Sequence, residues 1–234
     1  MSGRQLMRVE HMNEIYPNLY ETDGEFPFAG SPFQTRAFLL VRPEGNLWVY
    51  GSGQVEAHAE FIRGKGGIKK QFLSHSDEAG SFCDRTRELF GAPLTCPEQE
   101  KEIVSTKCQV DETFNEDGEL ESGFEFVMTP GHTAGSSCYI WHTLAGNILF
   151  IGDNLSPDKD GVWRAILLRK GLNVRDEIIH SLGKIRNLKI DLLVPAGSQN
   201  DKSHLAVTQQ QWNEIVDDCI ARLNSINTSD VFAV

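Results

Sequence analysis

Three short apolar segments of this sequence end abruptly in residues that can bind metal ions. Residues 69–73 have the length and composition of a buried strand and are followed by the sequence SHSDEAG at 74–80. Residues 127–129 lead into Pro-Gly-His-Thr, and residues 147–151 lead into Gly-Asp at 152–153. Ligands of α/β proteins bind where strands end, so the sequence predicts that these segments meet at one site.

The polar residues at these strand ends are imidazoles and carboxylates, the types from which metal ligands are drawn: His75, Asp77, Glu78, His132 and Asp153. If no metal binds, three carboxylates within a few ångströms would repel one another, and the pKa of at least one would rise. The fold would then need compensating hydrogen bonds, for which the nearby hydroxyl residues are candidates: Ser74, Ser76, Thr133 and Ser198.

Composition restricts the class of protein. The net charge of −11 argues against binding the phosphate backbone, so we expect no nucleic-acid partner. No segment approaches the roughly 20 apolar residues that span a bilayer, so we expect no membrane partner. Residues 1–13 lack the apolar core of a secretory signal. The five cysteines are an odd number without CxxC spacing, which is typical of reduced thiols in a cytoplasmic protein.

The order of the expected elements predicts the fold class. Apolar runs at 37–41 and 47–50 flank turn residues and predict a hairpin. Further strands are expected at 19–21, 69–73, 93–95, 124–129, 137–141, 148–151 and 191–194, and helices at 54–63, 81–90, 97–103, 174–185 and 207–223. Hairpins and strand–helix units therefore alternate twice along the chain. This favours an α+β fold of two mixed β-sheets packed face to face, with helices outside.

We expect a single domain over residues 1–234, because no linker or low-complexity segment interrupts the chain. Residues 1–16 are expected to form a loosely held leader, and residues 224–234 a frayed tail. The acid-rich residues 111–123 are expected to be solvated turns, and the segment 154–170 to be irregular. The loop at 25–36 carries three phenylalanines and is either part of the core or the apolar wall of a pocket.

These motifs resemble those of the metallo-β-lactamase superfamily, which comprises four-layer αβ/βα hydrolases and includes glyoxalase-II-like enzymes. The run GHTAGS at 131–136 is the most specific match, and Gly-Asp at 152–153 follows at the family's spacing. The signature of that family reads HxHxDHxG. Alignment on its C-terminal end places Gly80 at the final glycine, but Leu73 and Glu78 then stand where the family has histidines.

Carried over by position, the resemblance implies that His75 and His132 are the remainder of a first metal site. It implies that Asp77 is a ligand of the second site and that Asp153 is the bridging carboxylate. The family's last histidine is replaced by Ser198, and His204 is the alternative residue for that position. The resemblance also suggests a homodimer.

Two hypotheses follow from the missing histidines. In the first, one divalent zinc, iron or manganese ion is held by His75, His132 and Asp153, with Asp77 or Glu78 as a further ligand or as the catalytic base. Oxygen-rich ligation shifts the preference from zinc toward iron, manganese or magnesium. Three carboxylates around one divalent ion leave negative charge, which weakens activation of water and repels an anionic substrate. In the second hypothesis, no metal binds.

The first hypothesis predicts a metal-dependent hydrolase of the glyoxalase-II or lactonase kind that acts on a small-molecule substrate. The second predicts a non-catalytic, metal-free member of the fold that binds a small molecule or a protein in the former cleft. The loops around such a site determine the substrate, and the sequence does not identify it.

Overall fold

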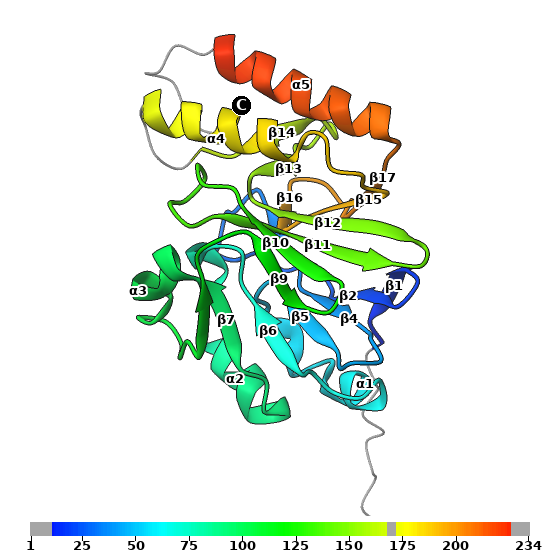
Figure 1. Cartoon of the computed structure of the whole chain (residues 1–234). Helices are drawn as coiled ribbons and strands as arrows, with labels where there is room; N and C mark the ends of the chain where they lie inside the picture. The colour runs from blue at the N-terminus through cyan, green and yellow to red at the C-terminus, as the bar shows by residue number, and fades with distance from the viewer. Residues whose placement is uncertain (1–10, 168–171, 226–234) are drawn as a thin grey trace, which may run out of the picture.

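Two β-sheets pack face to face and carry helices on their outer faces (Figure 1). The structure is a computed structural model and describes residues 11–167 and 172–225. Helices α1 (Ala59–Gly64) and α2 (Ser81–Phe90) cover one sheet, whereas α4 (Leu172–Ile185) and α5 (Gln209–Ser225) cover the other (Figure 1). This arrangement confirms the expected four-layer αβ/βα sandwich. Within the described ranges, no helix is both long enough and apolar enough to cross a bilayer.

The first sheet contains seven strands, which are antiparallel up to the fourth and parallel beyond it. Their order in the sheet is β1 (Asn13–Tyr16), β2 (Leu19–Glu21), β4 (Phe38–Leu40), β5 (Leu47–Val49), β6 (Lys70–Phe72), β7 (Leu94–Pro97) and β8 (Glu112–Phe114). Short helices connect and follow the parallel strands: η1 (Gly53–Val55), η2 (Ser76–Glu78), η3 (Glu98–Glu100) and α3 (Lys101–Val104).

The second sheet contains six strands with one parallel pair, between β12 and β15. Their order is β17 (Leu205–Ala206), β15 (Leu192–Pro195), β12 (Gly146–Gly152), β11 (Ser137–Thr143), β10 (Phe124–Met128) and β9 (Gly118–Glu121). Two small antiparallel pairs complete the fold: β3 (Gln34–Thr35) with β16 (Gly197–Ser198), and β13 (Leu155–Pro157) with β14 (Trp163–Ala165).

Strand β12 shows how alternation along a strand produces the layers. Ile148 and Phe150 face the core between the sheets, whereas Leu149 and Ile151 face the layer of α4 and α5. Successive side chains of a strand point to opposite faces, so a strand buried on both faces must be apolar at every position. This requirement explains the continuous apolar run that predicts β12 in the sequence.

Two buried tyrosines join the sheets at the ends of their central strands. The hydroxyl of Tyr50, which follows β5, accepts a hydrogen bond from the backbone N–H of Gly152 at 2.8 Å. The hydroxyl of Tyr139 in β11 donates to the carbonyl oxygen of Leu73, at the end of β6, at 2.5 Å. Each bond therefore joins the two sheets next to a predicted site residue, since Gly152 precedes Asp153 and Leu73 lies two residues before His75.

The structure corrects five expectations from the sequence, three of which concern the ends or continuity of elements. Residues 13–16, expected in a loose leader, form β1 and pair with β2. Residues 224 and 225, expected in the frayed tail, belong to α5, whereas 226–234 lie outside the described residues. The expected helix at 54–63 is divided into η1 and α1.

The other two corrections concern segments expected to lack regular structure. Residues 111–123 contain β8 and β9, and 154–170 contain β13 and β14, although 168–170 lie outside the described residues. The acidic strands are stabilised by two lysines of the strand β6 region. Lys69 and Lys70 contact Glu121 at 2.7 and 3.3 Å, and Lys70 also contacts Glu112 at 2.8 Å. Ladders with β7 and β10 thus form strands where local charge density indicates a turn, and these ion pairs offset part of the acidic charge.

We expect Tyr139→Phe to lower the free energy of unfolding by about 1–3 kcal/mol, because it leaves the buried carbonyl of Leu73 without a donor. Urea denaturation measures this loss. Tyr16→Phe is the matched control, since it removes the bond to Ala145 from a partly exposed tyrosine and should change stability by less than about 0.5 kcal/mol. Equal losses in the two variants would contradict the proposed role of Tyr139.

Candidate metal centre

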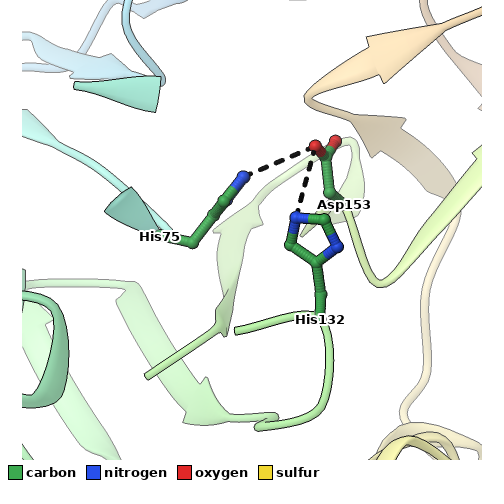
Figure 2. A group of neighbouring side chains, drawn as sticks. All are labelled: His75, His132 and Asp153. Carbon is green, nitrogen blue, oxygen red and sulfur yellow. Dashed lines mark ion pairs between the residues drawn. The ribbon is translucent and has the colours of Figure 1, made fainter. Parts of the chain in front are cut away.

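His75, His132 and Asp153 come together at the strand ends, as the sequence predicts (Figure 2). The Nε2 atom of His75 lies 3.4 Å from Oδ2 of Asp153, and the Nε2 atom of His132 lies 3.7 Å from the same oxygen. The two rings are perpendicular, with centroids 4.7 Å apart. Each of the three residues offers one potential ligand atom, and these atoms all lie within 4.8 Å of one another.

His75 follows β6 and is oriented by hydrogen bonds at its Nδ1 atom. This atom lies 3.0 Å from Oε1 of Glu78 and 3.0 Å from the hydroxyl of Ser74. The Ser74 hydroxyl donates its proton to Glu78, so Nδ1 of His75 must be the donor in both contacts. The Nε2 atom is therefore directed at Asp153.

His132 is held in the same way in the turn that follows β10. Its Nδ1 lies 2.9 Å from the carbonyl oxygen of Ile166, which can only accept a hydrogen bond, so Nδ1 carries a proton. Gly131 allows this turn to pack against α4: its φ is 142°, and a Cβ atom there would lie 2.1 Å from Ile178. The motif glycine is thus required by backbone conformation and by close packing.

Asp153 follows β12, where Gly152 turns the chain with a φ of 61°. A Cβ atom at Gly152 would lie 2.7 Å from the hydroxyl of Ser74, so glycine allows the segments carrying His75 and Asp153 to approach closely. The Asp153 side chain is 23% exposed, whereas those of His75 and His132 are 1% exposed. Asp153 therefore lies on the solvent side of the two imidazoles.

The Nε2 atoms of His75 and His132 are buried and have no hydrogen-bond partner in the described part of the chain. Their contacts with Asp153 are of ion-pair length and do not qualify as hydrogen bonds. A buried polar atom without a partner costs about 1–3 kcal/mol. Two such atoms directed at one carboxylate form a donor set that a divalent cation would satisfy.

The electrostatics of the cluster separate the two histidines. Burial lowers the pKa of His75, but the negative charges of Glu78 and Asp153 outweigh it and raise that pKa well above its usual value. Burial and the neighbouring His75 lower the pKa of His132. Burial raises the pKa of Asp153, but His75 and His132 outweigh it and hold that pKa below its usual value. Without a metal ion, these pKa directions favour a positively charged His75, protonated at both ring nitrogens, beside a neutral His132 and an ionised Asp153.

Asp77 and Glu78, expected as ligands or as a catalytic base, face different directions. The carboxylate of Asp77 is 53% exposed, and its Oδ2 lies 3.8 Å from Nε2 of His132, at the edge of the cluster. The carboxylate of Glu78 is buried and accepts hydrogen bonds from the backbone N–H and hydroxyl of Ser74. This geometry favours Glu78 as an orienting partner of His75, because Glu78 contacts Nδ1 and Asp153 faces Nε2.

The positions where the family has its other histidines are occupied by residues with structural contacts. Leu73 is buried in the core below α2. The Ser198 hydroxyl donates to the carbonyl of Asn200 at 2.8 Å. The His204 ring contacts Ser203 through Nδ1, and burial together with the charge of Arg36 lowers its pKa against the opposing effect of Glu21. None of these three residues belongs to the cluster formed by the described residues.

Among the hydroxyl residues expected to compensate the carboxylates, Ser74 bonds Glu78 directly. Ser76 lies within η2, and Thr133 bonds the hydroxyl of Ser136 at 2.8 Å. Nothing in the sequence indicates the role of the Ile166 carbonyl, because a backbone group has no side-chain signature and this one lies far along the chain from His132.

Comparisons with known proteins give a likeness of structure only. No family model matches the chain, and no curated protein matches it. A metallo-β-lactamase from Pontibacter korlensis is similar in structure with a TM-score of 0.69 and 16% identity, over 92% of this chain and 99% of that one. GOB-18 from Elizabethkingia meningoseptica gives 0.66 and 14%, over 98% and 97% of the two chains.

A third similar structure is native FEZ-1 metallo-β-lactamase from Legionella gormanii, with a TM-score of 0.64 and 14% identity over 89% of this chain and 92% of that one. These likenesses extend over nearly the whole length of each chain. Together with the sheet order and the place of the cluster at the strand ends, they show that this chain has the metallo-β-lactamase fold.

Proposed function

We propose that this protein is a metal-dependent hydrolase with a single divalent ion held by His75, His132 and Asp153. The observation that carries the proposal is the pair of buried Nε2 atoms without hydrogen-bond partners, which face one carboxylate. Catalytic zinc sites use three protein ligands of this kind and leave one position open. Two imidazoles and one carboxylate suit zinc, iron or manganese.

The chain's own residues divide the remaining tasks. When bound, a divalent ion would polarise a substrate carbonyl and increase the acidity of water. Glu78 and the carbonyl of Ile166 orient the two imidazoles through Nδ1, a support that typically strengthens metal affinity 10–100-fold. Asp77, exposed and 3.8 Å from His132, is the candidate general base, because it is the carboxylate of the group open to solvent.

The surroundings of the site favour a neutral substrate with an apolar part. Asp77 and Asp153 contribute negative charge at the solvent side. The end of the loop between Glu25 and Thr35 lies near Asp153, because Thr35 pairs with Gly197 and both Phe33 and Asp153 border that glycine; the same loop carries the 59% exposed Phe26. An ester, thioester or lactone with an apolar acyl group fits this environment, which agrees with a glyoxalase-II-like or lactonase-like activity.

A metal-free binding protein is the second candidate. One observation favours it: a protonated His75 between Glu78 at 3.0 Å and Asp153 at 3.4 Å would offset one of the two carboxylate charges without an ion. In that case the fold would present a small-molecule-binding or protein-interaction surface. Metal content distinguishes the two candidates directly.

We expect the purified wild-type protein, incubated with zinc, manganese or iron and then desalted, to retain about one ion per chain, and His132→Ala to retain almost none. His132→Ala removes one of three ligands and exposes the others. Elemental analysis of both proteins measures the difference. His142→Ala, which changes a 40% exposed histidine of β11, is the control and should bind as wild type does. A wild-type protein without metal would support the binding module instead.

We expect Asp77→Asn to lower kcat for p-nitrophenyl ester hydrolysis by about 10²–10⁴-fold while metal content stays unchanged, because a general base contributes about that much. Steady-state kinetics and elemental analysis on the same sample test this expectation. Asp218→Asn, on the exposed face of α5, provides the matched control. If metal were lost together with activity, Asp77 would be a ligand and not the base.

A further inference from the structure

The segment formed by η3 and α3 lies beside the two loops that carry the histidines and contains a buried carboxylate, Glu100. Glu100 is only 1% exposed, although a glutamate is rarely buried unless its charge is compensated. In the described part of the chain, Glu100 forms no ion pair with lysine or arginine. Its charge is instead compensated by backbone N–H groups and by the side chains of Ser76 and Thr133, all from the two loops that carry the histidines.

Each oxygen of Glu100 accepts a hydrogen bond from a different loop. Oε2 accepts from the backbone N–H of Ser76 at 3.0 Å, and Oε1 accepts from the backbone N–H of Gly135 at 2.6 Å. Ser76 is the residue between His75 and Asp77, whereas Gly135 belongs to the turn that begins with Gly131 and His132. One carboxylate thus connects the His75 loop to the His132 loop.

Lys107 binds the backbone carbonyl of Ser76, the residue whose N–H binds Glu100. Its Nζ donates to the carbonyl oxygen of Ser76 at 2.8 Å. The N–H and the carbonyl of Ser76 are therefore fixed by a carboxylate and an ammonium group, both from the segment that follows β7. Hydrogen bonds to charged groups are about twice as strong as neutral ones. This arrangement therefore restrains the backbone at Ser76, between His75 and Asp77.

The motif glycine at 135 is explained by this contact. A Cβ atom at Gly135 would lie 2.7 Å from Cγ of Glu100 and 2.9 Å from Oε1, so any side chain there would displace the carboxylate. The second glycine of the GHTAGS run therefore has a function that the metal ligands do not explain. It permits the approach of Glu100 to the His132 turn.

We propose that Glu100 is a positioning residue that sets the distance and orientation between His75 and His132. It acts through the backbone of Ser76 and Gly135 and has no contact with the ligand atoms themselves. A glutamine at this position has one acceptor oxygen and one NH₂ group, so it can satisfy one loop and must oppose the N–H of the other. The part of the proposal that concerns metal affinity rests on the proposed function; the geometric part does not.

The test compares Glu100→Gln with Glu102→Gln, a matched change of charge at an exposed position of α3. In protein without added metal, NMR-detected hydrogen exchange should be faster by about tenfold or more for at least one of the two amides, that of Ser76 or that of Gly135, in Glu100→Gln alone. The imidazole resonances of both His75 and His132 should also shift. Unchanged exchange and unchanged imidazole resonances, or the same changes in Glu102→Gln, would overturn the proposal.

Metal titration provides the functional part of the test. Where wild type binds Zn²⁺ or Mn²⁺, we expect the dissociation constant of Glu100→Gln to rise about 10–100-fold, as is typical when the support of a ligand is lost, and that of Glu102→Gln to stay unchanged. If wild type binds neither ion, the proposed metal function fails, and the exchange and imidazole data still decide the role of Glu100.

Lys107→Met is the second variant if Glu100→Gln does not fold. It releases only the carbonyl of Ser76, so the resonances of His75 should shift clearly more than those of His132, whose ring it reaches only through His75. Shifts of equal size at both histidines, or at neither, would contradict separate control of the two loops by this segment.

Discussion

Hydrogen bonds at the Nδ1 atoms of His75 and His132 determine what this site can do. The groups that receive them, a buried carboxylate in one case and a backbone carbonyl in the other, fix both rings so that the Nε2 atoms face Asp153. A neutral imidazole that has its Nδ1 proton engaged presents a lone pair at Nε2, which is the form that binds metal ions, so His75 must release its Nε2 proton when a cation binds. The cluster is therefore shaped for a cation before any cation binds.

The scaffold makes this arrangement possible by joining distant parts of the chain. The cluster residues follow β6 of the first sheet and β10 and β12 of the second sheet. Tyr50 and Tyr139 connect the sheets by hydrogen bonds at the same end of the sandwich. Glycines at the turns permit the close approaches that side chains would prevent. Fixed elements position such a site more accurately than free loops do.

The strand ends and their ligand residues could be predicted from the sequence because both signals are local. Residues 148–151 are apolar at every position, as a strand covered on both faces must be, and the cluster residues stand directly after such runs. The order of elements gave the layers, and helix 81–90 agrees with α2 at both ends. The resemblance to a family signature then implies that His75, His132 and Asp153 are metal ligands.

Long-range contacts account for what the sequence did not reveal. The direction of Glu78 depends on Ser74 and the ring of His75, and a run of acidic residues does not show which of them faces inward. The acidic segment at 111–123 forms strands through ladders with β7 and β10, and its Glu112 and Glu121 pair with Lys69 and Lys70, which are distant in the sequence. The role of Glu100 depends on two amides from separate loops, so no spacing in the sequence indicates it.

The most direct measurement is an anomalous-scattering map, collected at the absorption edge of the metal from crystals grown with zinc or manganese. We expect one peak, bounded by Nε2 of His75, Nε2 of His132 and the carboxylate of Asp153. Two peaks would show that the residues replacing the family's histidines still support a dinuclear site. A map without a peak at this cluster would contradict the central claim that the paired imidazoles and Asp153 hold one ion.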